Sequence, residues 1–399
     1  MSPSHAVTAL ESAPVGEAFC GEGNKPVPHT VIITSMLQTV NPWRVLVKGA
    51  ILFLAAEFIF FAINPDLSQL NIYITPTMKR QRFPYHTIAP EDTALDVGDL
   101  GAMFASHIVS EPKAPNEYRV FVLGDSAIWG AELPVNQTLT AQLNQLRLIC
   151  ANRNVQFYNL SYPNPSATKD LMILDEAMRY QPDSIIWPLT LYAVMPQVRA
   201  YHWVIKLNPD ELYKLNRRFH FLSMNYPPDT AWNEFKSQQT ALFRILRYQL
   251  FAAVTTAVGA DQIMIYDPSK VTQPALTRNL NFDDMTPPTI GPKPLSLDEI
   301  GFGYQISNGV PLLLINEPML IEKSVPNSDV QYNADYPRWI YDQYRQQLSY
   351  AAAKNNWNYL DLWNIFPPGY FSNTPLHLTP EGEIQLARVI APYVSKNCP

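Results

Sequence analysis

The chain has 399 residues, of which 47% are hydrophobic and 16% are charged, and its formal net charge is −6. This composition excludes wholesale disorder, and no run of five or more basic residues occurs, which argues against nucleic-acid binding through phosphate contacts. The three cysteines, Cys20, Cys150 and Cys398, form no CxxC pair, so the pattern predicts neither a disulfide-dense scaffold nor a zinc site.

The first feature in chain order is an apolar segment near the N-terminus. Residues 1–41 lack a sustained hydrophobic period and are predicted to be a disordered tail. Residues 45–63 are apolar apart from one lysine, one glycine and one glutamate. As a helix this run spans about 28 Å, close to the thickness of the hydrocarbon core of a membrane. Residues 42–65 are therefore predicted to be a single-pass membrane anchor.

Two alternatives stay open for this segment, namely a buried core helix and a cleaved signal peptide. The signal peptide fits less well, because the run starts more than forty residues into the chain and no small-residue cleavage site follows it closely. Arg44 and Lys48 lie on the N-terminal side of the run. The positive-inside rule therefore predicts a cytoplasmic N-terminus and an extracytoplasmic main domain.

Residues 66–117 are predicted to be a stalk and lead-in, and residues 118–399 a folded domain. The domain alternates apolar runs typical of buried strands with segments of helical period. The strands are YRVFVLGDS, NVQFYNL, SIIWPLTL, VPLLLIN and WNYLDLW, and the helices are 137–150, SATKDLMILDEAMRY (capped by Ser166 or Thr168), 335–355 and TPEGEIQLARVIAPYV. This alternation predicts a parallel sheet with helices on both faces.

Residues 197–300 break the alternation and are predicted to be an insertion with one long helix at about 231–258. Residues 242–259 could be interpreted as a second membrane span. Arg244 and Arg247 argue against a span, and an amphipathic helix that covers the core or rests on a membrane surface is the alternative.

Two residues could carry chemistry. Ser126 follows the first buried strand, at the edge where open α/β sheets place their ligands, and Gly124 allows the chain to turn there. His377 lies in LHLTPEG, just before the last helix, and imidazole is a suitable base for a serine hydroxyl. Taken singly, each has a structural alternative: a strand-to-helix turn for Ser126 and a loop or capping histidine for His377.

Together, the two segments resemble the SGNH (GDSL-like) hydrolases. VFVLGDSAIWG resembles the family's first block, which carries the nucleophilic serine, and LHLTPEGEIQLA resembles its last block, which carries the general base. The resemblance covers roughly 118–196 and 305–397. It implies a flavodoxin-like three-layer sandwich with a parallel central sheet, Ser126 as nucleophile, His377 as base, and no metal or other cofactor.

The sequence departs from the family pattern at three places. The family usually has an aspartate three residues before the histidine, where Thr374 stands, so Asp361 at the end of the preceding strand is the candidate replacement. A family glycine whose N–H helps to bind the oxyanion, together with that of Ser126, corresponds to Asn164. A family asparagine donor is missing, and Thr190 is the candidate substitute. Loss of one oxyanion donor typically costs ~10²–10³ in rate.

Two functions follow from the resemblance. The first is a membrane-anchored, extracytoplasmic serine esterase or O-acyltransferase acting on acyl groups, acetyl foremost, of an envelope glycan or related polymer. The second is a catalytically degenerate SGNH-fold protein that binds glycan or acts as a scaffold for a membrane acyltransferase or an export system. Because the helix after the nucleophile strand and the last helix pack close together in SGNH folds, a disulfide between Cys150 and Cys398 is also implied, with Cys20 free.

Overall fold

The chain divides into two units, residues 1–64 and 65–399. Most of the predicted tail and stalk and the second half of the predicted helix 231–258 lie outside the described residues. The computed structural model describes residues 41–65, 80–83, 85, 98–223, 230–240, 242, 243, 246, 273–283, 285–288, 290, 295–396 and 398.

The described part of the first unit is one helix, α2 (Pro42–Ile63). Asn41 caps its start, because the Asn41 side chain accepts hydrogen bonds from the backbone N–H groups of Trp43 at 3.0 Å and Arg44 at 3.4 Å. The helix ends at Asn64, which adopts the left-handed conformation. None of its residues is buried, and it is long and apolar enough to cross a membrane.

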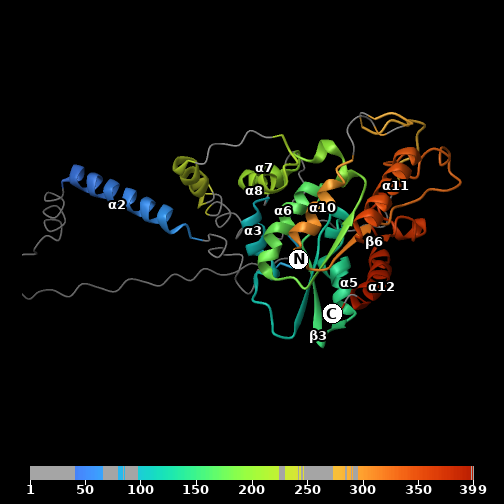
Figure 1. The fold of residues 1–399 in the computed structure, drawn as a ribbon, viewed down its shortest axis with the longest axis horizontal. Helices are drawn as coiled ribbons and strands as arrows, with labels where there is room; N and C mark the ends of the chain where they lie inside the picture. The colour runs from blue at the N-terminus through green and yellow to red at the C-terminus, as the bar shows by residue number, and fades with distance from the viewer. Residues whose placement is uncertain are drawn as a thin grey trace, which may run out of the picture. The chain divides into compact units, whose positions relative to one another are not determined.

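The second unit is built on a six-stranded sheet (Figure 1). The strand order is β2-β3-β1-β4-β5-β6, and every neighbouring pair is parallel except β2 and β3. Numbered along the chain, the five parallel strands have the order 2-1-3-4-5 of flavodoxin-like folds, which confirms the predicted fold class. The strands are β1 (Glu117–Val122), β2 (Ile149–Cys150), β3 (Arg153–Asn159), β4 (Ser184–Leu189), β5 (Leu312–Asn316) and β6 (Asn358–Asp361).

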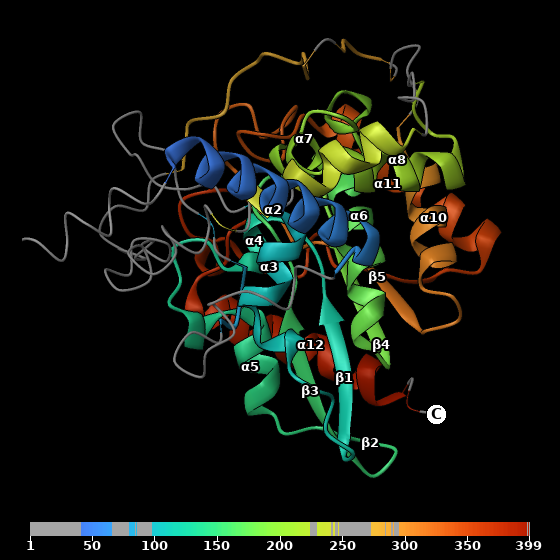
Figure 2. The same cartoon turned by 90° about the vertical axis from the view of Figure 1, so that its left-hand side faces the viewer.

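Helices cover both faces of the sheet, each over its own hydrophobic core (Figures 1 and 2). One face carries α3 (Leu100–Ser106), α6 (Ala167–Ala177), α10 (Asp298–Ile306) and α11 (Arg338–Asn355), and the other carries α5 (Leu139–Gln145) and α12 (Pro380–Lys396). Phe121 belongs to the first core, whereas Val120 and Val122 belong to the second. Successive side chains of a strand point to opposite faces of the sheet, and both faces are buried here. The strands therefore have continuous apolar sequences.

The predicted helix 137–150 is wrong in its second half. Helix α5 ends at Gln145, and Cys150 lies in the short strand β2. Ala151 and Asn152 both have positive φ angles, 49° and 60°, as a two-residue hairpin turn requires, so the chain reverses into β3 there. Cys150 is nevertheless bonded to Cys398, with 5.4 Å between the two Cα atoms, which confirms the implied disulfide.

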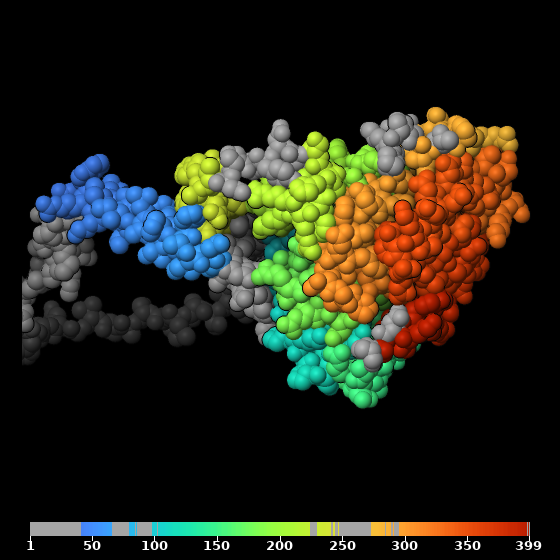
Figure 3. Space-filling model, viewed as in Figure 1, coloured from blue at the N-terminus to red at the C-terminus, as the bar shows by residue number. Residues whose placement is uncertain are grey.

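The end of the predicted insertion contains a helix that the sequence did not reveal. Helix α10 precedes β5, and its Gly303 packs so closely on Trp187 of β4 that a Cβ there would lie 2.3 Å from the indole ring. Within the last residues of the predicted insertion, Glu299 is buried and Ile300 belongs to the first core. The described start of the insertion forms α7 (Trp203–Leu207) and α8 (Pro209–Phe219). In Figure 3, the orange and red segments from α10 onward form one side of the visible domain surface.

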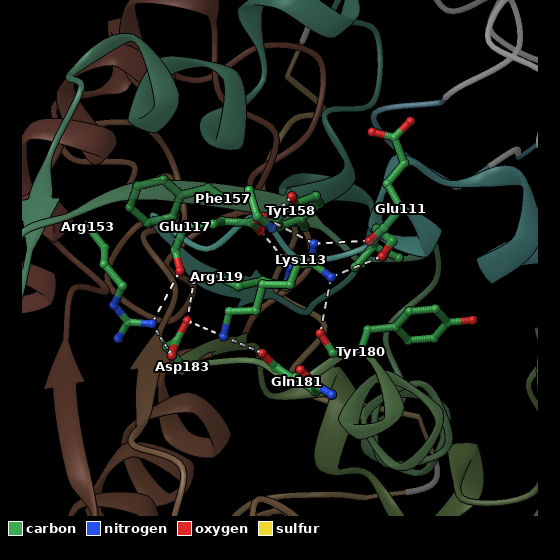
Figure 4. Close-up of polar contacts among 12 residues, drawn as sticks. Glu111, Lys113, Glu117, Arg119, Arg153, Phe157, Tyr158, Tyr180, Gln181 and Asp183 are labelled. Atoms are coloured by element: carbon green, nitrogen blue, oxygen red, sulfur yellow. Dashed lines mark hydrogen bonds and ion pairs between the residues drawn. The ribbon is translucent and has the colours of Figure 1, made fainter.

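A charged network holds the amino-terminal edge of the sheet (Figure 4). Arg119 of β1 is buried and pairs with Glu117 through Nε and Oε1, 2.6 Å apart. Its guanidinium also donates to three backbone carbonyls, and the hydroxyl of Tyr158 donates to Glu117 at 2.8 Å. Asp183 accepts from Lys113 at 2.6 Å and from Arg153 at 2.9 Å. These contacts fix the start of β1, at the opposite end of that strand from Ser126.

Candidate active site

Ser126 begins the short helix α4 (Ser126–Trp129), directly after β1. Gly124 has a φ of +133°, and a Cβ at this position would lie 2.8 Å from the side chain of Ile128, so glycine is required here. The Asp125 side chain caps α4 by accepting from the N–H of Ala127 at 2.9 Å. This turn places Ser126 at the carboxyl edge of the sheet, as predicted.

The buried side chain of Lys169 stabilises this turn. Lys169 Nζ donates to the carbonyl of Gly124 at 2.8 Å and pairs with Asp170 at 3.0 Å. Burial raises the pKa of Asp125, while the hydrogen bond from Ala127 and the charge of Lys169 act in the opposite direction. The cation therefore offsets part of the cost of burying carboxylates beneath Ser126.

A short loop between residues 371 and 379 carries His377. The N–H of Ser372 donates to the carbonyl of His377 at 2.8 Å, which closes the loop. Thr374 Oγ1 accepts from the backbone N–H of His377 at 3.0 Å. Gln273, from the predicted insertion, donates through Nε2 to the carbonyls of Ser372 at 2.6 Å and Thr374 at 3.2 Å. The insertion thus contributes directly to the position of the histidine.

Ser126 and His377 meet although 251 positions separate them. His377 Nε2 lies 2.9 Å from Ser126 Oγ, within hydrogen-bond distance, and both side chains are partly exposed. Burial lowers the pKa of His377 to about 4. The imidazole is therefore neutral near pH 7 and can accept a proton from the serine hydroxyl.

The other imidazole nitrogen does not meet a predicted partner. Asp361 instead accepts from Asn316 Nδ2 at 2.8 Å and pairs with Arg345 at 2.9 Å. Thr374 binds the backbone of His377 rather than its ring. The predicted contact of either side chain with the imidazole is therefore wrong, and His377 Nδ1 lies 3.3 Å from Asn373 Oδ1. Asn373 was missed, although it stands in the histidine loop.

The residues predicted to bind an oxyanion have different surroundings. Asn164 has a φ of 67°, in the left-handed region that glycine and asparagine tolerate best, which explains why asparagine can replace the family's glycine. No described residue accepts a hydrogen bond from the N–H of Asn164 or Ser126. Thr190 is buried with its hydroxyl beside Tyr336, and within the described ranges no hydrogen bond joins it to Ser126 or His377. The oxyanion roles stay predictions.

In the part of the chain that the structure describes, no group of three or more His, Cys, Asp or Glu side chains is placed to hold a metal ion. Among the described side chains, the site brings together the hydroxyl of Ser126 and the imidazole of His377. A hydroxyl beside a neutral imidazole is an arrangement suited to nucleophilic attack on an acyl carbonyl.

No protein-family model matches the sequence, and no curated protein matches it. Solved structures similar to this chain include a carbohydrate acetylesterase family member from Sinorhizobium meliloti, with a TM-score of 0.31 and 12% identity, covering 69% of this chain and 96% of that one. A putative lipolytic protein of the G-D-S-L family from Desulfitobacterium hafniense DCB-2 has a TM-score of 0.32 and 13% identity, covering 70% and 98%. TesA has a TM-score of 0.34 and 13% identity, covering 70% and 98%.

Similarities at this level say nothing about the activity of the chain. The resemblance to SGNH hydrolases that the two sequence blocks carry is nevertheless confirmed by the molecule itself. The parallel strands follow the order 2-1-3-4-5, Ser126 follows the first strand, and His377 precedes the last helix and reaches the serine hydroxyl. The chain thus has the fold that its resemblance to SGNH hydrolases implies.

Proposed function

We propose that the domain is a serine esterase or acyltransferase of the SGNH type that works through an acyl-serine intermediate. The observation that carries this proposal is the 2.9 Å contact between Ser126 Oγ and His377 Nε2. A serine hydroxyl is a weak nucleophile on its own, and an adjacent neutral imidazole is what activates it.

The reaction would run in two halves. As Ser126 Oγ attacks the carbonyl carbon of an ester, its proton passes to His377 Nε2, and the backbone N–H groups of Ser126 and Asn164 stabilise the oxyanion. The intermediate collapses, the C–O bond to the leaving alcohol breaks, and the imidazolium gives its proton to that alkoxide. Water, or a second alcohol in a transferase, then attacks the acyl-serine while His377 again accepts a proton. As the C–Oγ bond breaks, the imidazolium returns that proton to Ser126 Oγ, which restores the free enzyme.

We further propose that this domain lies outside the cytoplasm and acts on acyl groups, acetyl foremost, of an envelope glycan or related polymer. Helix α2 supports a membrane anchor, and the disulfide between Cys150 and Cys398 supports an oxidising compartment, where such bonds persist. A membrane-bound acyltransferase would be the partner if the second half-reaction is a transfer. Fusions of a reporter that is active only outside the cytoplasm test the orientation: a fusion after Pro399 should work and one before Val45 should fail.

The activity is tested with a fluorophosphonate probe on the full-length chain in detergent, with the adduct located by mass spectrometry. We expect an adduct on Ser126 that is absent in Ser126→Ala and formed on the order of 10²–10⁴ times more slowly in His377→Ala, the contribution typical of a general base. Unchanged thermal unfolding of both variants would show that the loss is chemical.

The second candidate, a non-catalytic binding or scaffolding protein, is favoured by one observation. His377 Nδ1 faces the amide of Asn373 and not a carboxylate that could stabilise an imidazolium directly. A folded wild-type chain with no adduct on Ser126, tested both alone and with membranes that contain acyltransferases, would leave only this second function.

A further inference from the structure

Asn373, which contacts His377, is also hydrogen-bonded to a third residue. Asn373 Nδ2 donates a hydrogen bond to Glu132 Oε1 across 241 sequence positions. The side chain of Ser372 is a second hydrogen-bonding partner of the same carboxyl group. A continuous path therefore joins Glu132, the amide of Asn373, the imidazole of His377 and the hydroxyl of Ser126.

This path has a direction, because its members differ in what they can donate. Burial raises the pKa of Glu132, while the hydrogen bonds from Ser372 and Asn373 act in the opposite direction and favour the carboxylate. A carboxylate oxygen accepts, and it is the amide nitrogen of Asn373 that faces Glu132 Oε1. The amide oxygen then faces His377 Nδ1, and since that oxygen also only accepts, Nδ1 must carry the proton. Nε2 is consequently bare and directed at Ser126 Oγ, the tautomer that a general base needs.

Glu132 is held firmly in the place from which it acts. Its φ of 68° is in the left-handed region, unusual for a glutamate. Arg82 clamps the surrounding turn by donating from Nη1 to the carbonyls of Gly130 at 2.9 Å and Leu133 at 3.0 Å. An unfavourable backbone conformation that the structure over-determines is often found at functional sites.

We propose that Glu132 and Asn373 are positioning residues that together replace the usual third carboxylate of the triad and select the tautomer of His377. The inference rests on the proposed function, because it assigns these residues to the same site. An amide is known to serve in the third position of such sites, and here the carboxylate stands one residue further back. The two residues also tie the segment after Ser126 to the loop before His377 at a second point.

The tautomer of His377 can be measured without any activity. We would label the histidines of the full-length chain with nitrogen-15 and record the ring nitrogens by NMR, with the His377 signal identified by its loss in His377→Gln. The wild type should carry its proton on Nδ1. Glu132→Gln should give a mixture of tautomers, because the new side chain can donate as well as accept and no longer fixes the direction of the Asn373 amide.

Exchanging the carboxylate and the amide between positions 132 and 373 distinguishes an effect of hydrogen-bond direction from an effect of packing alone. Asn373→Asp alone places two carboxylates against each other, and they cannot both ionise comfortably. Combining Asn373→Asp with Glu132→Gln restores a donor facing an acceptor and keeps a proton acceptor at Nδ1. We expect each single variant to lower the rate of fluorophosphonate labelling of Ser126 by on the order of 10–10²-fold and the double variant to recover most of it.

Asp361→Asn is the matched control, because Asp361 is an acidic residue at the end of β6 whose side chain contacts Asn316 and Arg345 and not the imidazole. It should leave the tautomer of His377 unchanged. The proposal is overturned if Glu132→Gln keeps the wild-type tautomer, or if the double variant folds but shows no recovery relative to the single variants in either readout. Should Ser126 fail to label even in the wild type, the proposed function fails, while the NMR result still decides the positioning role.

Discussion

Gly382, in the first turn of α12, lies against Tyr370, the residue immediately before the loop that carries His377. A Cβ on Gly382 would lie 2.7 Å from the carbonyl oxygen of Tyr370 and 3.0 Å from Cβ of Leu378, so no side chain fits between helix and loop. The position of His377 relative to Ser126 therefore depends on Gly382, five residues further along the chain than His377.

Gly382→Ala should displace the histidine loop. We expect a loss of about 1–3 kcal/mol in the free energy of unfolding, the usual cost of overpacking, and a fall in the rate of Ser126 labelling. Gly369→Ala is the matched control, because nothing lies within 4 Å of a Cβ at that position. Urea unfolding and labelling rates of the two variants check the prediction, and equal behaviour of both would contradict it.

The pH dependence of activity should reflect the lowered pKa of His377, about 4. Neutral imidazole is the active form, so kcat/KM for a chromogenic acetyl ester should fall only as pH drops toward about 4, and not near the ordinary histidine value of about 6.5. The measurement is a pH–rate profile. An acidic limb centred between about 6 and 7 would show that burial does not govern this group.

The same pKa has a consequence for stability. In the unfolded chain a histidine titrates near about 6.5, so between roughly pH 6.5 and 4 the unfolded state binds a proton that the folded His377 does not. His377 therefore lowers the free energy of unfolding as the pH falls through this window. His377→Gln should be less sensitive to pH there, which urea unfolding at pH 7 and pH 5 tests.

Arg119 should be the most costly member of the network in Figure 4 to remove. Burial raises the pKa of Glu117, but hydrogen bonds from Arg119, the N–H of Ala114 and Tyr158 outweigh it, so the pKa is lowered overall. Arg119→Met would leave this carboxylate without its cation, and the expected loss is about 3–5 kcal/mol in the free energy of unfolding.

Arg278→Met is the control for that prediction, because the side chains of Arg278 and its partner Asp329 are 74% and 63% exposed. An ion pair at the surface contributes only about 0–1 kcal/mol. Denaturant unfolding of the two variants should therefore separate them by at least about 2 kcal/mol. Similar losses would mean that burial of the guanidinium does not set the cost.

The disulfide predicts both a thiol count and a stability change. The denatured, unreduced chain should titrate one free thiol, that of Cys20, because Cys150 and Cys398 are joined. The bond closes a loop across 248 positions, and replacing both cysteines by serine should lower the free energy of unfolding by about 2–5 kcal/mol. Three titratable thiols would refute the pairing.

Several parts of the fold could be predicted from the sequence because their signals are local. The buried strands read as apolar runs, and Ser166, one of the two predicted caps, does cap α6 by accepting from the N–H of Lys169. Helix α10 escaped prediction because the proline-rich residues before it resemble an extended loop. The end of α5 escaped it because apolar residues at helical spacing continue into the hairpin of β2 and β3.

The candidate site likewise has residues that local sequence patterns predict and contacts that they do not. By itself, the sequence determined Ser126 and His377, since each stands in a short block next to a strand or helix boundary that local patterns reveal. Only the tertiary structure decided which side chain faces the second imidazole nitrogen. Asp361 pairs with Arg345 instead, whereas Asn373 and Glu132 meet across 241 positions. The segments that carry them are brought together because Ile128 of α4 and Phe371 and Leu378 of the histidine loop are buried in the same core. Such a contact depends on the packing of distant segments, and no local period or motif encodes it.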